Sequence, residues 1–269
     1  MNATVSHTVT SADGTTLACD RVGSGPALVL VDGALCHRKA GPNGALAEQL
    51  AGSFTVYTYD RRGRGESGDT GPFSLDKEID DLRAVIEEAG GSAMVYGISS
   101  GAALALEAAE RGLPITALAL FEAPFVVDDS RAPVPAEYVA RLSELVAAGN
   151  RSGAVKYFMR TGVGLPAPMV ALMPLMPAWK GLKAVAHTLP YDTAFVVDRQ
   201  RGEPLPTWHG VKVPTLVVDG GKSPQWMRNA MRALAQAVPG AGYRTLPGQT
   251  HIVKAEALAP VLAEFFTTA

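Results

Sequence analysis

The stretch Val95-Tyr96-Gly97-Ile98-Ser99-Ser100-Gly101-Ala102 decides the fold of this chain of 269 residues. It matches the pattern G-x-S-x-G and lies between an apolar run and a segment of helical composition. In a sharp strand-to-helix turn the central residue is strained, which presents the Ser99 hydroxyl above the sheet. Gly97 and Gly101 suit such a turn because a side chain there would collide with the neighbouring strand or helix. The alternative is a capping serine at a glycine-lined helix start, but the strand context favours a nucleophilic Ser99.

Short apolar runs alternate with helical patterns on both sides of this turn, as in a parallel sheet built from βαβ units. Parallel strands are covered on both faces, so their sequences are almost wholly apolar. The first residues indicate an antiparallel hairpin around an Asp13-Gly14 turn. We therefore predict an α/β fold with a mostly parallel, eight-stranded sheet flanked by helices. The predicted strands are His7–Thr10, Thr16–Val22, Ala27–Val31, Phe54–Asp60, Ala93–Gly97, Ile115–Phe121, Thr215–Val218 and Tyr243–Leu246, and the predicted helices are Ser74–Ala89, Ala102–Arg111, Pro224–Val238 and Ala255–Phe266.

Residues 124–208 interrupt this alternation. They show no convincing strand, many prolines and four of the eight methionines. Helical pieces are predicted at Ala136–Ala148 and Trp179–Leu189. A structural excursion is the simpler alternative, but a Met-rich helical insertion suits the roof of an apolar pocket. We predict a core formed by residues 1–123 and 209–269, with 124–208 inserted as a helical cap.

Size and charge limit the expected partners. The length fits one core with a large insertion, and a net charge of −2 without a Lys/Arg block gives no support for nucleic acid or a membrane. The polar start of the chain lacks the features of a secretory signal, and no apolar run is long enough to span a membrane. Cys19 and Cys36 are expected to be reduced. We expect a cytoplasmic protein, and the sequence leaves its oligomeric state open.

Among the five histidines, only His251 follows the last predicted strand and precedes the C-terminal helix. The chain order nucleophile, acid, histidine places the base at this point. A histidine on a surface loop is the alternative. His37 and His187 could line the pocket, although a structural role is the simpler expectation for each.

The segment Asp60-Arg61-Arg62-Gly63-Arg64-Gly65-Glu66-Ser67 invites two interpretations. With Gly68 it satisfies G-x-G-x-x-G, but turn residues follow where a dinucleotide site needs a helix. We therefore predict no nucleotide cofactor, and nothing else implies a metal or an organic cofactor. The segment is similar to the D-x-x-G-x-G-x-S stretch common in the α/β-hydrolase superfamily. Together with the Ser99 turn, the chain resembles this superfamily over nearly its whole length, which implies a serine hydrolase.

The acid partner of His251 is open between two carboxylates. In many members of the superfamily an aspartate follows the strand Thr215–Val218, but here that position holds Ser223. Asp219 ends this strand and Glu122 ends the preceding one, so either could reach the histidine at the carboxyl edge of the sheet. Glu122 has the longer arm and follows an apolar strand, where an unpaired charge would be costly. We favour Glu122, with Asp219 as the alternative.

An oxyanion hole needs two convergent backbone N–H groups. One belongs to Ser100, which follows the nucleophile. The other comes from the turn after Ala27–Val31 and is contributed by Gly33 or Ala34. Asp32 stands where the superfamily usually has a histidine.

Within the superfamily, the chain is similar to the zearalenone-type lactonases. The shared features are Asp32-Gly33 after the oxyanion strand, the Ser99–Ala102 turn, Glu122 at a strand end, and the Leu246–Gly248 turn before the histidine. This resemblance also implies Glu122 as the acid. Haloalkane dehalogenases are similar at Phe121-Glu122, but they need an aspartate nucleophile where this chain has Ser99.

These residues predict hydrolysis of a small apolar carboxylic ester or lactone. Ser99 would form an acyl-enzyme, with His251 as the base and Glu122 orienting it. The alternative from another class is a ligand sensor with vestigial hydrolysis. Among enzymes, the alternatives are a cofactor-free perhydrolase and a C–C bond hydrolase.

Overall fold

The structure is a computed structural model, and it describes residues 3–269. The first two residues of the predicted core 1–123 therefore lie outside the described residues. Its centre is a sheet of eight strands in the order β1-β2-β4-β3-β5-β6-β7-β8. β2 pairs antiparallel with β1 and β4, and every pairing from β4 onward to β8 is parallel. This confirms the predicted mostly parallel sheet with a hairpin at its edge. The strands are β1 Val5–Thr10, β2 Thr16–Gly23, β3 Ala27–Val31, β4 Thr55–Tyr59, β5 Ala93–Ile98, β6 Ile115–Phe121, β7 Thr215–Gly220 and β8 Gly242–Leu246.

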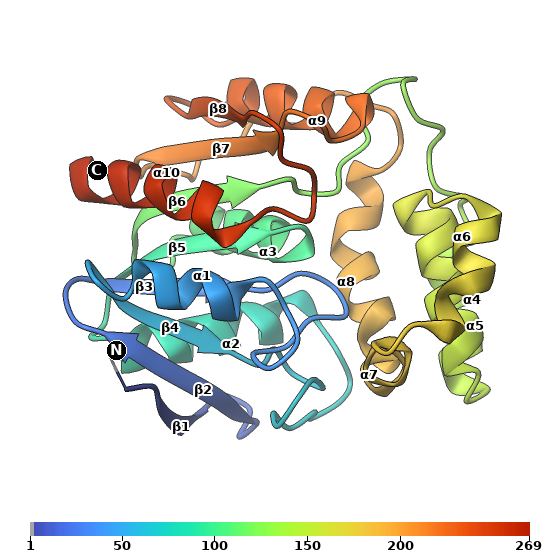
Figure 1. Cartoon of the computed structure of the whole chain (residues 1–269), viewed down its shortest axis with the longest axis horizontal. Coiled ribbons are helices and arrows are strands. Elements are labelled where there is room, and N and C mark those ends of the chain that lie inside the picture. Colours follow the sequence, from blue (N-terminus) through green and yellow to red (C-terminus); the bar gives the residue numbers. More distant parts are fainter. Residues whose placement is uncertain (1–2) are drawn as a thin grey trace.

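Helices cover both faces of the sheet (Figure 1), which explains why the central strands are wholly apolar. Successive side chains of a strand point to opposite faces. Val29 therefore packs into the core shared with α2, α3 and α9, whereas Leu28 and Leu30 pack into the core shared with α1 and α10. These helices are α1 Asn43–Leu50, α2 Leu75–Glu88, α3 Ser100–Glu110, α9 Gln225–Ala237 and α10 Ala255–Thr268.

The residues between β6 and β7 form the group of helices at the right of Figure 1, where β6 and β7 point toward them. We call residues 124–208 the cap segment. In the described chain it contains helices and turns but no strand. Its side chains form a third apolar cluster of their own, centred on Tyr138, Leu142 and Leu189. The helices are α4 Tyr138–Ala147, α5 Arg151–Tyr157, α6 Ala167–Leu172, α7 Trp179–Ala184 and α8 Leu189–Val196, with a π-helical turn at Phe158–Val163 and 3-10 turns at Met173–Leu175, Ala186–Thr188 and Val197–Arg199.

Two local differences from the predicted elements have physical reasons. The helix predicted over Trp179–Leu189 is divided, since α7 ends at Ala184 and α8 begins at Leu189 with Pro190 in its first turn. Proline is accepted there because the first helical N–H groups need no helical partner. Helix α1 was not predicted, and it begins after Pro42 without a side-chain cap.

Helix α8 occupies a special place between the cap segment and the core. It packs against α3 of the core and against α4 of the cap segment. Its Val196 belongs to the core cluster under the sheet, whereas Leu189 at its other end belongs to the cap cluster. The cap segment is therefore fastened to the core along α8.

Candidate active site

Ser99 lies on a sharp turn between β5 and α3. Its backbone angles are φ 57° and ψ −127°, a conformation rarely adopted by residues with a side chain. The turn is close-packed, because a Cβ atom on Gly97 would collide with the Gly101 carbonyl and one on Gly101 would lie 2.6 Å from the Asp32 carbonyl oxygen. The Ser99 N–H donates to the Phe121 carbonyl at 2.9 Å. This geometry fixes the half-buried serine at the carboxyl edge of the sheet.

The structure brings His251 and Glu122 together. His251 lies in the loop between β8 and α10, and its Nδ1 is 2.8 Å from Glu122 Oε2. The other carboxylate oxygen of Glu122 accepts the Gly220 N–H at 2.7 Å, and the Glu122 side chain is fully buried. The His251 side chain is 35% exposed, so its ring spans from the buried carboxylate to open space.

Asp219, the alternative acid, has different partners. Its Oδ2 accepts the Tyr243 hydroxyl at 2.6 Å and lies 3.8 Å from Arg228 Nε. Within residues 3–269 it has no bond to His251. The geometry therefore pairs the histidine with Glu122 and leaves Asp219 in a separate polar cluster.

The backbone of Ser99 is hydrogen-bonded to the residue that precedes the acid. The Phe121 carbonyl accepts the Ser99 N–H, and the next residue in the chain is Glu122, which holds His251. The Phe121 ring lies 6.5 Å from the His251 ring, centroid to centroid. In the described chain no hydrogen bond joins the Ser99 hydroxyl to His251, so the predicted proton transfer requires that contact to form with substrate.

Backbone strain gathers at this site. In residues 3–269, the residues other than glycine with positive φ are Leu35 at 62°, Ser99 at 57° and Glu122 at 46°. Such conformations are unfavourable by roughly 1–3 kcal/mol each and persist where the surrounding structure imposes them. All three follow strands of the parallel sheet. Leu35 belongs to residues 32–35, which we call the proposed oxyanion loop, Ser99 is the proposed nucleophile and Glu122 is the proposed acid. The three strained residues therefore lie at the positions that the sequence assigned to the candidate site.

Gly33 lies directly against the serine. A Cβ atom at position 33 would be 2.8 Å from Ser99 Cβ, so only glycine fits. Ala34 and Leu35 then pack against the apolar cluster of the cap segment. Ser100 opens α3 and is buried. Ser99 therefore lies between residue 33, which it contacts across the sheet edge, and Ser100, which follows it in the chain.

Asp32 replaces the usual histidine as a buried carboxylate. Burial raises the pKa of Asp32 to about 7, although Arg64 and Arg61 act in the opposite direction. Its Oδ1 has no hydrogen-bond partner among the described residues. Asp32 therefore changes protonation state near neutral pH, at the start of the proposed oxyanion loop.

A buried ionic cluster, not predicted from the sequence, lies behind this loop. Asp192 on α8 accepts hydrogen bonds from Arg61 and Arg64, and Arg61 also makes two 2.8 Å bonds to Glu78. The two arginines belong to the D-x-x-G-x-G-x-S segment, where three arginines in a loop between buried elements were a signal that carboxylates must lie nearby. Nothing in the local pattern indicated Asp192.

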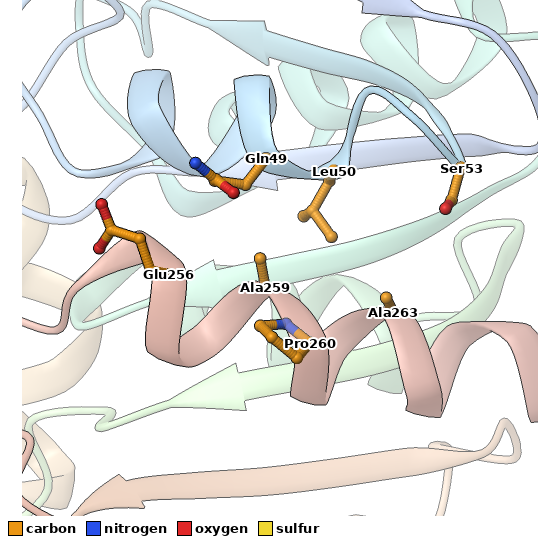
Figure 2. Close-up of a pocket in the computed structure, with 7 residues that line it drawn as sticks. All are labelled: Gln49, Leu50, Ser53, Glu256, Ala259, Pro260 and Ala263. Atoms are coloured by element: carbon orange, nitrogen blue, oxygen red, sulfur yellow. The ribbon is translucent and has the colours of Figure 1, made fainter.

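Two hollows lie away from Ser99 and His251. One of about 410 Å³ lies at the seam between core and cap segment and is lined by His37, Lys39, Asp60, Gly63, Gly65, Glu66, Ala184, Val185 and His187. Figure 2 shows the other, of about 210 Å³, where Leu50 on α1 faces Ala259 on α10. His37 and His187 thus line the hollow at the seam, whereas Ser99 and His251 line neither of these two hollows.

Residues 3–269 contain neither a cluster of metal-ligating side chains nor a helix that could cross a membrane. No three His, Cys, Asp or Glu side chains are gathered so that they could hold a metal ion. No helix there combines the length and the apolar character that crossing a bilayer requires.

The fold and the strained serine turn define a class, the α/β-hydrolase fold, and comparison with known proteins agrees. Residues 30–261 match the model of the alpha/beta hydrolase family, so the chain belongs to that family of hydrolases. No curated protein matches the chain.

Solved structures show the same architecture. An alpha/beta hydrolase from Sphaerobacter thermophilus DSM 20745 is similar with 54% identity and a TM-score of 0.90, over 97% of this chain and 100% of that chain. An enol-lactonase from Burkholderia xenovorans LB400 has 23% identity and a TM-score of 0.70, over 96% and 99%. An epoxide hydrolase from Vigna radiata has 16% identity and a TM-score of 0.68, over 99% and 98%. The last two likenesses concern the fold alone, and the resemblance to zearalenone-type lactonases stays a prediction.

Proposed function

We propose that the chain hydrolyses a small apolar carboxylic ester or lactone through an acyl-enzyme on Ser99. The observation that carries the proposal is the bond of 2.8 Å between His251 Nδ1 and the buried Glu122 carboxylate, next to a strained serine. A carboxylate on Nδ1 keeps the proton on that nitrogen, so Nε2 is free to accept the proton of the serine hydroxyl.

In the first half of the reaction, Ser99 Oγ forms a bond to the carbonyl carbon while its proton passes to His251. The carbonyl electron pair moves to the oxygen, which the amides of Ser100 and of Gly33 or Ala34 stabilise. Collapse of this intermediate breaks the bond to the leaving alkoxide, which takes the proton from His251. Water then attacks the acyl-enzyme in the same way, releasing the acid and restoring Ser99.

The apolar character of the proposed substrate rests on the cap segment. Its cluster of Leu, Val and aromatic side chains packs against Ala34 and Leu35, the residues that follow Gly33. A lactone is opened by the same acyl transfer as an ester, and one structural neighbour is named an enol-lactonase. A small-molecule substrate without nucleic-acid or membrane partners, the boundaries of the cap and a cytoplasmic location stay predictions.

The test is Ser99→Ala, assayed with p-nitrophenyl esters. We expect turnover to fall by about 10⁴-fold or more, because the nucleophile has no substitute, while the thermal midpoint stays close to that of the wild type. Ester turnover that persists in Ser99→Ala would refute the assignment. A panel of aryl esters, short alkyl esters and macrolactones then defines the substrate. Ligands that raise the melting temperature without turnover would favour the sensor instead.

A further inference from the structure

One carboxylate of the cap segment binds three donors of the core. Asp192 Oδ1 accepts the Ser100 hydroxyl at 2.7 Å and Arg61 Nη1 at 2.8 Å, and Arg64 Nη2 bonds to both Asp192 oxygens at 2.8 and 2.7 Å. All four side chains are buried, with at most 2% of each residue exposed. Asp192 belongs to α8, so these bonds cross from the cap segment into the sheet edge that carries Ser99.

The two arginines also bind the proposed oxyanion loop, Arg64 through its other Nη atom and Arg61 through the same Nη1 atom that binds Asp192. Arg64 Nη1 donates to the Gly33 carbonyl at 2.7 Å, and Arg61 Nη1 donates to the Asp32 carbonyl at 3.2 Å. In a planar trans peptide the C=O and N–H groups point in opposite directions. A Gly33 carbonyl held by Arg64 therefore turns the Ala34 N–H to the far side of the loop. The Asp32 carbonyl does the same for the Gly33 N–H.

The other half of the oxyanion hole depends on the same carboxylate. Ser100 supplies the amide that follows the nucleophile, and its hydroxyl is the group that binds Asp192. Leu35 adds an apolar connection, because its side chain is part of the cap cluster although it belongs to the oxyanion loop. The residues on both sides of the proposed oxyanion hole are thus connected to Asp192 on α8.

Charge explains why the cluster is stable while buried. Burial raises the pKa of Asp192, but Arg64 and Arg61 lower it further, so the net pKa lies below the usual value and Asp192 is ionised at neutral pH. With Glu78, the cluster has two cations and two anions. Neutralising Asp192 would leave a buried cation uncompensated, and the loop that this cation holds would lose its fixed position.

We propose that Asp192 is a positioning residue for the oxyanion hole, which it orients through Ser100, Arg61 and Arg64. The cap segment therefore supplies part of the apparatus for transition-state stabilisation, in addition to covering the substrate. This inference rests on the proposed ester or lactone hydrolysis at Ser99.

The test is Asp192→Asn, measured with a p-nitrophenyl ester and with an arylboronic acid. Ser99 Oγ adds to boron to give a tetrahedral anion that mimics the transition state. We expect kcat to fall by about 10- to 100-fold with KM within about threefold, because removing an oxyanion donor costs about 10²- to 10³-fold and a donor that is only misplaced costs less. Affinity for the boronic acid falls by the same factor, while the planar carboxylate product binds unchanged. A merely structural role would not separate the two ligands.

The matched control is Asp81→Asn. Asp81 is equally buried and binds Arg62 through both oxygens at 2.8 and 2.7 Å, but it does not contact the oxyanion loop. We expect it to lower the thermal midpoint without changing kcat per folded molecule. Equal losses of kcat in both variants, or a wild-type kcat in Asp192→Asn, would overturn the inference.

Ser100→Ala keeps the inference testable if Asp192→Asn does not fold. It removes the hydroxyl that donates to Asp192 at 2.7 Å and accepts Arg61 Nη1 at 3.3 Å, and it leaves the Asp192 carboxylate and both arginines in place. We expect a loss of about 3- to 10-fold in both kcat and boronic-acid affinity. Unchanged values in a folded Ser100→Ala would also overturn the inference. A wild-type protein that neither turns over esters nor labels at Ser99 with a fluorophosphonate refutes the proposed function itself. The role of Asp192 in an oxyanion hole then falls with it.

Discussion

The bond between Glu122 and His251 leads to a sharp expectation for Glu122→Gln. In the wild type both partners donate to the carboxylate, Gly220 through its backbone N–H and His251 through its protonated Nδ1, and a glutamine has only one oxygen for these two donors. The Gly220 N–H is a donor and needs an acceptor oxygen, so the glutamine amide oxygen turns to Gly220. The amide NH2 then faces His251 Nδ1 and makes that nitrogen an acceptor. The proton is forced to Nε2, where it blocks transfer from Ser99.

The magnitude follows from charge and from this tautomer change. A carboxylate about 4 Å from a developing imidazolium contributes about 4 kcal/mol at an effective dielectric of about 20, which is about 10³-fold in kcat. Because the wrong tautomer must also be corrected, we expect a total loss of about 10⁴-fold, the size found when a buried triad carboxylate of a serine protease is replaced by its amide. KM changes little, since Glu122 is fully buried and does not face the substrate.

The assay is steady-state turnover of a p-nitrophenyl ester by Glu122→Gln and by Asp219→Asn in parallel. Asp219 binds Tyr243 and is close to Arg228, so its variant loses stability but keeps kcat within about threefold of the wild type. Thermal midpoints show that both variants are folded. A nearly unchanged rate in Glu122→Gln, together with a lost rate in Asp219→Asn, would show that the pairing of acid and histidine has been misassigned.

Two further predictions concern the oxyanion loop. Gly33→Ala places a Cβ atom 2.8 Å from Ser99 Cβ, so we expect kcat to fall by about 10- to 100-fold, whereas Gly52→Ala, whose added Cβ meets no atom within 4 Å, leaves kcat unchanged. Asp32→Asn tests the raised pKa: between its usual value of 3.8 and about 7 the folded protein binds more protons than the unfolded chain, so Asp32 lowers stability as pH rises. Denaturant titrations should show that Asn stabilises the protein by about 2–3 kcal/mol more at pH 8 than at pH 5, and parallel pH profiles would contradict this.

The sequence determines the sheet because buried parallel strands have a distinctive composition. Ile115–Phe121 was predicted with the bounds that the structure has, since apolar side chains on both faces leave no ambiguity. Helix α1 escaped prediction because it is only eight residues long and has no capping side chain. Its helical state depends on packing against α10, which is about two hundred residues later in the chain.

Some residues of the candidate site can likewise be predicted from local sequence, whereas others depend on contacts between distant parts of the chain. The turn at Ser99 and the loop histidine follow from short patterns, and burial of an acidic strand end favours Glu122. Asp192 could not be found in this way, because its partners Arg61 and Arg64 lie about 130 residues away in sequence. Pairing buried arginines with one particular aspartate among several requires the tertiary fold.

The position of α8 has a consequence for engineering and for divergence among relatives. The cap segment is a natural unit to exchange between relatives, but its helix α8 packs on α3 and binds Ser100, the residue after Ser99. Grafts that replace residues up to the turn before Leu189 keep this connection intact. Grafts that extend through α8 must bring matching partners for residues 61, 64 and 100, so the exchangeable unit is shorter than the insertion.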